Sequence, residues 1–291
     1  MITTEQKEKI VRGMDEARKT FGGTDGKFAQ MLGISASQYS RVKRGEWEQV
    51  LADVVWIGIA RQLEIELVEG RQWNTAVTPV FTFISTQLER CQKEGLSSLL
   101  CDLSDIGKTW TAKRYRKTHK NVAYIDCSLN KSKAQLIRAI AKQFGLDDRG
   151  RLRDLEANLC YYLKTLDNPL VILDEAGDLH YEAFLELKAL WNATEGCCGW
   201  YMMGADGLKA KMQRSIDCKK VGYAELFSRF GKRYGTVVPV ADEGKEMMRA
   251  TALMIIKANG GEDAAKVLRK TMGDDGMPSL RRIYTELRKN Q

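Results

Sequence analysis

The sequence lacks the long apolar run that a membrane-spanning helix requires. None of its hydrophobic stretches approaches the roughly eighteen residues of such a helix. Its first nine residues already include both acidic and basic side chains. A secretory leader would instead have a basic start followed by an apolar stretch. We therefore expect a soluble protein that is not exported, has no membrane partner and lies in the cytoplasm of a bacterial or infected host cell.

Histidine is scarce, and the cysteines are not paired at metal-binding spacing. The chain has two histidines and seven cysteines, and no Cys-x-x-Cys pair or Cys/His cluster occurs in it. Because the number of cysteines is odd and several lie in apolar runs, we expect them to be reduced core residues. This pattern argues against both a disulfide framework and a zinc site.

Basic residues are in excess, and the excess is uneven. The formal net charge is +8, yet residues 1–70 carry ten Lys and Arg against eleven Asp and Glu. The surplus therefore belongs to the rest of the chain. Such a surplus suggests a polyanionic partner, although solvated helix faces account for many surpluses of this kind.

Gly107-Lys108-Thr109 closes a segment that joins an apolar run, 96–101, to a helical pattern, 110–117. This strand-loop-helix context is the one in which Gly-Lys-Thr predicts a phosphate-binding loop. Lys108 would contact the β- and γ-phosphates, the Thr109 hydroxyl would bind Mg²⁺, and backbone N–H groups would hold the phosphates. The expected nucleotide contacts are Asp105, Ile106, Gly107, Lys108, Thr109 and Trp110.

The loop departs from the full Gly-x-x-x-x-Gly-Lys-Ser/Thr pattern. Asp102 takes the position of the first glycine, and Asp105 follows three residues later. Two carboxylates near a triphosphate oppose its binding, unless they face solvent or pair with Lys or Arg, and Asp105 has to adopt a geometry that glycine takes more easily. A strand-turn-helix that binds no nucleotide is the competing interpretation.

A second motif lies about sixty residues downstream. The apolar run 170–173 ends in the paired carboxylates Asp174 and Glu175, which predicts a buried strand with acids at its carboxyl end. Asp174 would act at the metal with Thr109, and Glu175 would position or deprotonate an attacking water. The two motifs together predict an ATPase with ATP and Mg²⁺ as ligands.

The segment 28–45 has the spacing of a helix-turn-helix. Gly33 permits the tight turn, Ser35 caps the second helix, and Tyr39 and Val42 are core positions. This segment resembles the helix-turn-helix of phage-repressor-like domains. The expected DNA contacts are Ala36, Ser37, Gln38 and Arg41 toward the groove, and Lys43 and Arg44 toward phosphates. Because this region is near neutral, a protein-contact or vestigial role stays open. The apolar residues after it, Trp47, Val54, Trp56, Ile57 and Ile59, are expected in the helical core.

The expected domains are a helix-turn-helix domain at 1–68, a linker at 69–79, an ATPase core at 80–240 and a helical lid at 241–291. Within the core, helical patterns alternate with five strand-like runs at 96–101, 121–127, 170–173, 199–203 and 236–240. Such alternation predicts an α/β fold, a parallel sheet flanked by helices with its ligand site at the carboxyl ends of the strands.

The order of these motifs resembles the AAA+ ATPases of DNA transposition over nearly the whole chain. The most specific stretch, 224–233, reads Ala-Glu-Leu-Phe-Ser-Arg-Phe-Gly-Lys-Arg and is similar to the family's Leu-Phe-Ser-Arg-x-x-Lys-Arg segment. The resemblance implies an AAA+ P-loop core, a C-terminal helical lid and an N-terminal all-α domain. It also implies that Arg229 is an arginine finger that reaches a neighbouring subunit, with Arg233 as the alternative.

Two further positions follow from the resemblance. The strand that ends at 202–206 normally carries a polar sensor residue, and here that position is Ala205, with Asp206 as a substitute. Arg281 corresponds to the sensor arginine of the lid, and Arg282 is the adjacent alternative. Because the loop acids and Ala205 depart from the pattern, we expect slow hydrolysis, stimulated by DNA or a partner, with ATP acting as an assembly switch.

The resemblance further implies a homo-oligomer, a ring or a helical filament around double-stranded DNA, that recruits and stimulates the transposase of a phage or another mobile element. Basic groups would grip phosphates without reading sequence. The candidates are Lys131, Lys133, Lys209 and Lys211. Two other functions stay open: a DNA-binding adaptor or repressor with a degenerate ATPase fold, and an ATPase of the helicase-loader type.

Overall fold

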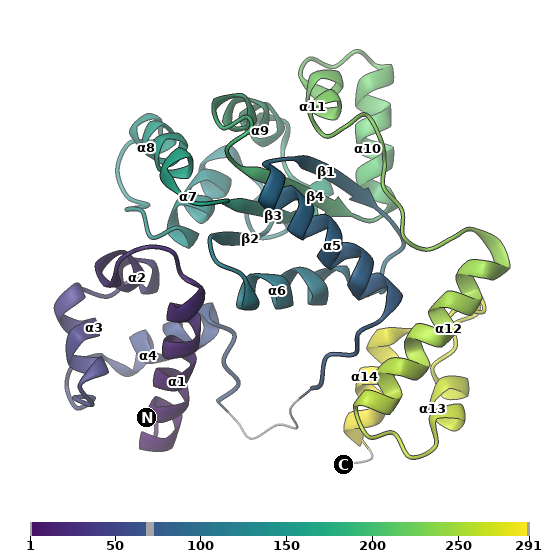
Figure 1. Ribbon diagram of the computed structural model, residues 1–291, viewed down its shortest axis with the longest axis horizontal. Coiled ribbons are helices and arrows are strands. Elements are labelled where there is room, and N and C mark those ends of the chain that lie inside the picture. Colours follow the sequence, from purple (N-terminus) through teal and green to yellow (C-terminus); the bar gives the residue numbers. More distant parts are fainter. Residues whose placement is uncertain (1, 68–72, 290–291) are drawn as a thin grey trace.

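The computed structural model describes residues 2–67 and 73–289 of the chain (Figure 1). Four helices come first, an α/β core follows, and three helices end the chain. The first four are α1 (Thr4–Thr20), α2 (Asp25–Leu32), α3 (Ala36–Lys43) and α4 (Asp53–Gln62). The last three are α12 (Ala241–Ala258), α13 (Ala264–Lys270) and α14 (Leu280–Lys289).

The core is built on a parallel sheet of four strands in the order β1-β4-β3-β2. The strands are β1 (Ser97–Cys101), β2 (Val122–Asp126), β3 (Leu170–Asp174) and β4 (Gly199–Gly204). Helices α5 (Pro79–Glu94) and α6 (Lys108–Thr118) cover one face of the sheet, as Figure 1 shows. The other face is covered by α7 (Lys133–Gln143), α8 (Leu152–Thr165), α9 (Tyr181–Ala193), α10 (Asp206–Asp217) and α11 (Tyr223–Arg229).

Strand alternation divides the core into two clusters. Leu99 and Leu173 pack with α7 to α11, whereas Leu100 and Ile172 pack with α5 and α6. Because both faces are covered, β3 is buried at every position, which explains its continuous apolar run. The motif-bearing ends of β1 and β3 therefore meet at one edge of a rigid sheet.

The strand expected at 236–240 is wrong. Gly235, just before this segment, forms an isolated bridge with Leu100. The N–H groups of Val237 and Val238 donate instead to one carboxylate oxygen of Asp102, at 2.5 and 3.0 Å. Pro239 has no N–H to donate. The segment is therefore fixed by a buried side chain in place of a strand ladder.

The N-terminal helices have a core of their own, in which Phe28, Tyr39 and Trp56 are fully buried. Gly33 ends α2 with a φ of 77°, and the Ser35 hydroxyl caps α3 through the N–H of Gln38. The two helices are thus joined by the turn that the sequence predicts. The expected burial of Val54 and Ile57 is wrong, because these side chains are 75% and 52% exposed on α4.

The domain boundaries stay a prediction, and residues 69–72 of the expected linker lie outside the described residues. Its described end lies along α12: the N–H of Asn74 donates to the Asn259 side-chain oxygen at 2.8 Å, and the Asn259 amide donates back to the Asn74 carbonyl. Trp73 packs on the cluster formed by the last three helices. This segment therefore belongs structurally with the C-terminal helices.

All seven cysteines are free thiols. Cys197 and Cys218 are exposed, so the expectation of core positions is wrong for these two. In 2–67 and 73–289, no helix is long and apolar enough to span a membrane. Over the same residues, no group of three His, Cys, Asp or Glu side chains is close enough to hold a metal ion by itself.

Candidate nucleotide site

Lys108 begins α6 at the end of the loop that follows β1. Its Nζ donates to the carbonyl oxygens of Asp102 and Leu103, at 3.0 and 2.5 Å. The residue is 6% exposed, and this burial lowers the pKa of its ammonium group, while the carboxylates of Asp102 and Glu175 oppose the shift. A buried cation at a helix start favours an anionic ligand there.

The Thr109 hydroxyl and Asp174 meet at the edge of the sheet. The hydroxyl donates to Asp174 Oδ2 at 2.7 Å, and the Tyr124 phenol donates to the same oxygen at 2.8 Å. Burial and the neighbouring carboxylate raise the pKa of Tyr124, so its phenol stays a donor. A hydroxyl and a carboxylate oxygen in contact form the partial ligand set that Mg²⁺ takes beside phosphates, so these residues fit the ion.

Glu175 follows Asp174 with a left-handed φ of 50° and an exposed side chain. Desolvation, and then the charge of Asp174, raise the pKa of its carboxyl group above the ordinary value. A carboxylate of raised pKa is a better proton acceptor. Glu175 lines a cavity of about 130 Å³ together with Lys108, Thr109, Ala205 and residues of the loop.

The two loop acids behave differently. Asp102 is 4% exposed, and its carboxylate accepts the N–H groups of Leu103, Val237 and Val238. It neither faces solvent nor pairs with a side-chain cation. Asp105 has a φ of 59° and binds the start of α14: its Oδ2 accepts the Ser279 hydroxyl at 2.7 Å and the Arg281 N–H at 3.3 Å. Asp105 therefore ties the phosphate loop to the C-terminal helices.

Arg281 stands at the mouth of the same cavity. Its Nε lies 3.7 Å from Asp105 Oδ1, and its side chain is 86% exposed. It lines the 130 Å³ cavity with Lys108 and Thr109. Arg282 points elsewhere, since its guanidinium donates to the Met272 carbonyl. Of the two neighbouring arginines, the geometry thus brings Arg281 to the site.

A larger apolar cavity of about 490 Å³ adjoins this one, and sequence reasoning missed it. The two cavities share Asp105, Gly107, Trp110 and Arg281. The larger one is lined by aromatic rings from three parts of the chain, Trp73, Phe81, Trp110 and Tyr284. The Trp73 and Tyr284 rings are 4.9 Å apart. A flat aromatic ligand group fits such a wall, and Thr109 lines the adjoining smaller cavity.

The family model described as "AAA domain" matches residues 92–212, which contain β1, the phosphate loop, Asp174 and β4. The chain contains an AAA domain. It is homologous to the Mu-like prophage FluMu DNA transposition protein B of Haemophilus influenzae, with 28% identity over 72% of this chain and 73% of the relative. The ATP-dependent target DNA activator B of Escherichia phage Mu is 29% identical, over 47% of this chain and 43% of the relative.

Among solved structures, Cdc6p from Pyrobaculum aerophilum is similar to this AAA domain protein. The TM-score is 0.49 and the identity 17%, over 72% of this chain and 57% of the other. The similarity is to the fold alone.

Arg229 does not line either of the two cavities of the candidate nucleotide site. It ends α11, where its Nε donates to the Asn192 side-chain oxygen at 2.6 Å and its guanidinium lies over the Trp191 ring. Arg233 is exposed after α11. Neither arginine lines the two cavities of the candidate nucleotide site, and the arginine-finger role of Arg229, with Arg233 as the alternative, stays a prediction.

The four lysines predicted to contact DNA differ in their surroundings. Lys133 is held between Glu156 and Glu186, at 2.9 and 2.7 Å. Lys211 donates to the carbonyls of Gly177 and Leu179. Both are thereby engaged within the AAA domain. Lys131 is exposed and lies 3.4 Å from Asp178, and Lys209 is exposed near the Tyr234 ring. Lys131 is therefore also paired with a carboxylate, although it is exposed, whereas Lys209 forms no ion pair and no side-chain hydrogen bond within residues 2–67 and 73–289.

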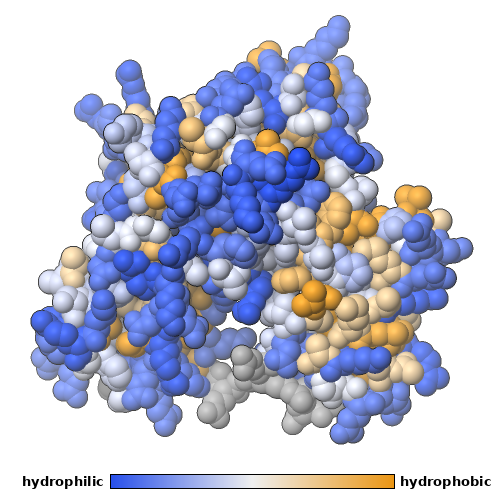
Figure 2. Space-filling model, viewed as in Figure 1, coloured by the Kyte–Doolittle hydropathy of each residue, from blue (hydrophilic) through white to orange (hydrophobic). Residues whose placement is uncertain are grey.

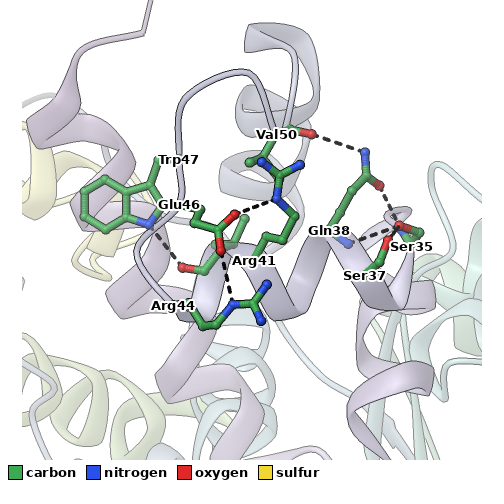
Figure 3. A network of polar contacts seen from close by, with 9 residues as sticks. Ser35, Ser37, Gln38, Arg41, Arg44, Glu46, Trp47 and Val50 are labelled. Atoms are coloured by element: carbon green, nitrogen blue, oxygen red, sulfur yellow. Dashed lines mark hydrogen bonds and ion pairs between the residues drawn. The ribbon is translucent and has the colours of Figure 1, made fainter.

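The predicted DNA contacts of α3 are engaged in internal bonds (Figure 3). Gln38 completes the capping box with Ser35 and donates to the Val50 carbonyl at 3.2 Å. Arg41 and Arg44 both pair with Glu46, at 2.7 and 3.2 Å. Lys43 pairs with Asp25 at 3.0 Å. Each cation would have to exchange a carboxylate for a phosphate on binding DNA.

Proposed function

We propose that this chain is an ATP-dependent DNA-binding protein of transposition, which assembles on target DNA without reading its sequence and stimulates a transposase. The observation that carries the proposal is the convergence of Lys108, Thr109, Asp174, Glu175 and Arg281 around one edge of the sheet. The printed names of the relatives, DNA transposition protein B and target DNA activator B, give the process.

The two joined cavities accommodate the two parts of ATP. Trp110, Trp73 and Tyr284 line the cavity that would hold the base, and the loop from Asp105 to Trp110 lines the cavity that would hold the phosphates. Lys108 exchanges its two carbonyl acceptors for phosphate oxygens, which are stronger partners because they are charged. Mg²⁺, when bound, would supply positive charge that neutralises the phosphates. Thr109 and Asp174 hold it from the protein side.

Hydrolysis in this site is slow. Glu175 is placed to accept a proton from water and is aided by its raised pKa. Position 205 is alanine, so it offers no polar side chain to stabilise the charge that develops on the phosphates during hydrolysis. Asp105 adds a negative charge at the loop. The ATP-bound state is therefore long-lived. In this state the lid closes and the assembly surfaces are exposed. DNA or a partner raises the rate by supplying the missing contacts.

Assembly uses two different faces of the protein. One face carries the nucleotide cavity, and the other carries Arg229. A contact between unlike faces repeats into a ring or a helical filament. Such a filament presents Lys131 and Lys209 of every subunit to duplex DNA and gives binding that weakens steeply with salt.

The test is binding of a random-sequence duplex without nucleotide, with ADP, with ATP and with a slowly hydrolysed ATP analogue. We expect large assemblies on DNA only with the triphosphates, and a loss of at least about tenfold in affinity for Lys108→Ala. The matched control is Lys120→Ala, which removes an exposed lysine just beyond α6. DNA binding that ignores nucleotide overturns the proposal and favours the adaptor function. Tight binding of one sequence without ATP favours a repressor.

A further inference from the structure

The N-terminal helices dock on α6, the helix that begins at the phosphate loop (Figure 1). Glu64 pairs with Lys113 and Lys117 of α6, at 2.5 and 3.6 Å. A second contact is close enough to require glycine, since a Cβ at Gly145 would stand 2.5 Å from the Lys27 carbonyl oxygen. The two domains therefore meet along a fixed interface.

This interface encloses a cavity of about 580 Å³ between α1 and the second half of α6. Its floor is apolar and includes Phe21, Leu63, Ile65 and Val122. Around the floor stand five cations from both domains, Lys9, Arg12, Arg114, Arg116 and Lys117, against two carboxylates, Glu16 and Glu66. The cavity has the size of a small-molecule site, and its lining carries an excess of positive charge.

Arg116 is the decisive residue of the cavity. Within 2–67 and 73–289 its guanidinium makes no hydrogen bond and no ion pair, although burial lowers its pKa and only the more distant charge of Glu64 opposes the shift. The Oε1 atom of Gln143, on the same wall, is buried without a donor among the described residues. Arg116 is half-buried on the wall of the cavity, and the planar fork of a guanidinium without a protein partner suits phosphate.

We propose that this interdomain cavity binds a phosphate-bearing ligand, with Arg116 as the central contact and Arg12 and Arg114 at the rim. The cavity shares no lining residue with the candidate nucleotide site. Arg116 stands about 12 Å along α6 from Lys108. The two sites are therefore separate but lie on one rigid helix, and a ligand here joins α1 to α6 across the domain interface.

The shared chemistry is a phosphate group beside an apolar body, and two sources carry it. A free nucleotide has the size of the cavity and offers a base to its apolar floor. The backbone of DNA offers phosphates and sugars in series. The cations of both domains would grip either ligand only while the domains are docked.

The test is calorimetric titration of the full chain with inorganic pyrophosphate, in the original protein, in Lys108→Ala, in Arg116→Gln and in the double variant. We expect each single variant to lose one of two binding events and the double variant to lose both. An unchanged stoichiometry in Arg116→Gln overturns the proposal. The result is independent of the proposed function, because failure at the phosphate loop removes only the event that depends on Lys108.

Rim variants keep the test valid if Arg116→Gln folds poorly. Arg12 and Arg114 are exposed, so glutamine at either position preserves the fold, and we expect about fivefold weaker binding at this site in each. Lys120→Gln is the matched control and leaves the affinity unchanged. In Lys108→Ala, competition by ADP assigns a nucleotide as the ligand, and competition by a short duplex but not ADP assigns the DNA backbone. Rim variants that bind as the original protein does overturn the proposal.

Discussion

At the scale of single residues, Asp105 and Asp102 show that two departures from one motif have opposite meanings. Asp102 is buried under three backbone N–H donors and holds the segment after α11 against the loop. Asp105 is partly exposed, lines the nucleotide cavities and binds the start of α14. Of these two acids, only Asp105 therefore has a carboxylate that would face a bound triphosphate.

We expect Asp105→Asn to tighten ATP binding by about threefold to tenfold, because removing one negative charge near the phosphates is worth roughly 1 kcal/mol. Asparagine tolerates the left-handed backbone and keeps an oxygen for the Ser279 hydroxyl. The measurement is a titration with a fluorescent ATP analogue. Asp102→Asn is the contrasting variant. The asparagine NH₂ group would face backbone N–H donors that the carboxylate now accepts, so we expect the urea concentration at the midpoint of unfolding to fall. Equal or weaker ATP binding in Asp105→Asn contradicts this account.

The residues that a local motif could reveal were those adjacent in sequence to Gly-Lys-Thr and to the paired acids of β3. Tyr124, Trp73 and Tyr284 escaped prediction, because they reach the site from β2, from the segment before α5 and from α14. No short spacing connects these segments. Their roles depend on the strand order and on the packing of α14.

At the scale of elements, capping residues mark where helices begin. Thr78 with Pro79 begins α5, and the Ser132 capping box begins α7. The expected strand at 236–240 failed because an apolar run cannot reveal that a buried Asp102 takes its N–H groups. The prediction that Val54 and Ile57 are buried was wrong for a related reason, since the residues that cover a helix face come from distant parts of the chain.

The docking of the N-terminal domain on α6 gives a prediction about pH. Burial raises the pKa of Glu64, but the hydrogen bond from Lys113 and the charges of Lys113 and Lys117 outweigh it and leave the pKa below its ordinary value. A lowered carboxyl pKa contributes stability above the unfolded value, near 4.5, and this stability disappears as pH falls through the folded value.

We therefore expect Glu64→Gln to lower the free energy of unfolding by about 0.5–1 kcal/mol at neutral pH and to have a vanishing effect in acid. Urea unfolding at a series of pH values measures both. Glu48→Gln, an exposed change in the same domain, is the control and should change nothing at any pH. A difference that persists or grows in acid would show that the ion pairs with α6 do not stabilise the docked arrangement.

At the scale of the whole molecule, Arg229 is not among the residues that line the candidate nucleotide cavity. The cavity lies at the start of α6 beside α14, whereas Arg229 ends α11 and contacts α9. Figure 2 shows hydrophilic side chains over much of the α/β core and apolar side chains over the lobe of the C-terminal helices. A polar surface of this kind suits an interface that forms and dissolves with nucleotide. Arg229 is already oriented by Asn192 and by the Glu225 carbonyl.

Complementation between two inactive variants tests whether Arg229 acts across such an interface. Lys108→Ala disables the phosphate loop but keeps the arginine, and Arg229→Ala keeps the loop but loses the arginine. If the arginine serves a neighbouring subunit, each variant alone loses DNA-stimulated ATPase activity. An equal mixture recovers about a quarter of it, because that share of unlike-face contacts joins an intact loop to an intact arginine. Arg233→Ala mixed in the same way examines the alternative arginine. No recovery in either mixture would place the source of the missing charge within a single subunit, and the contact between Asp105 and Arg281 would then be the candidate link between nucleotide and the C-terminal helices.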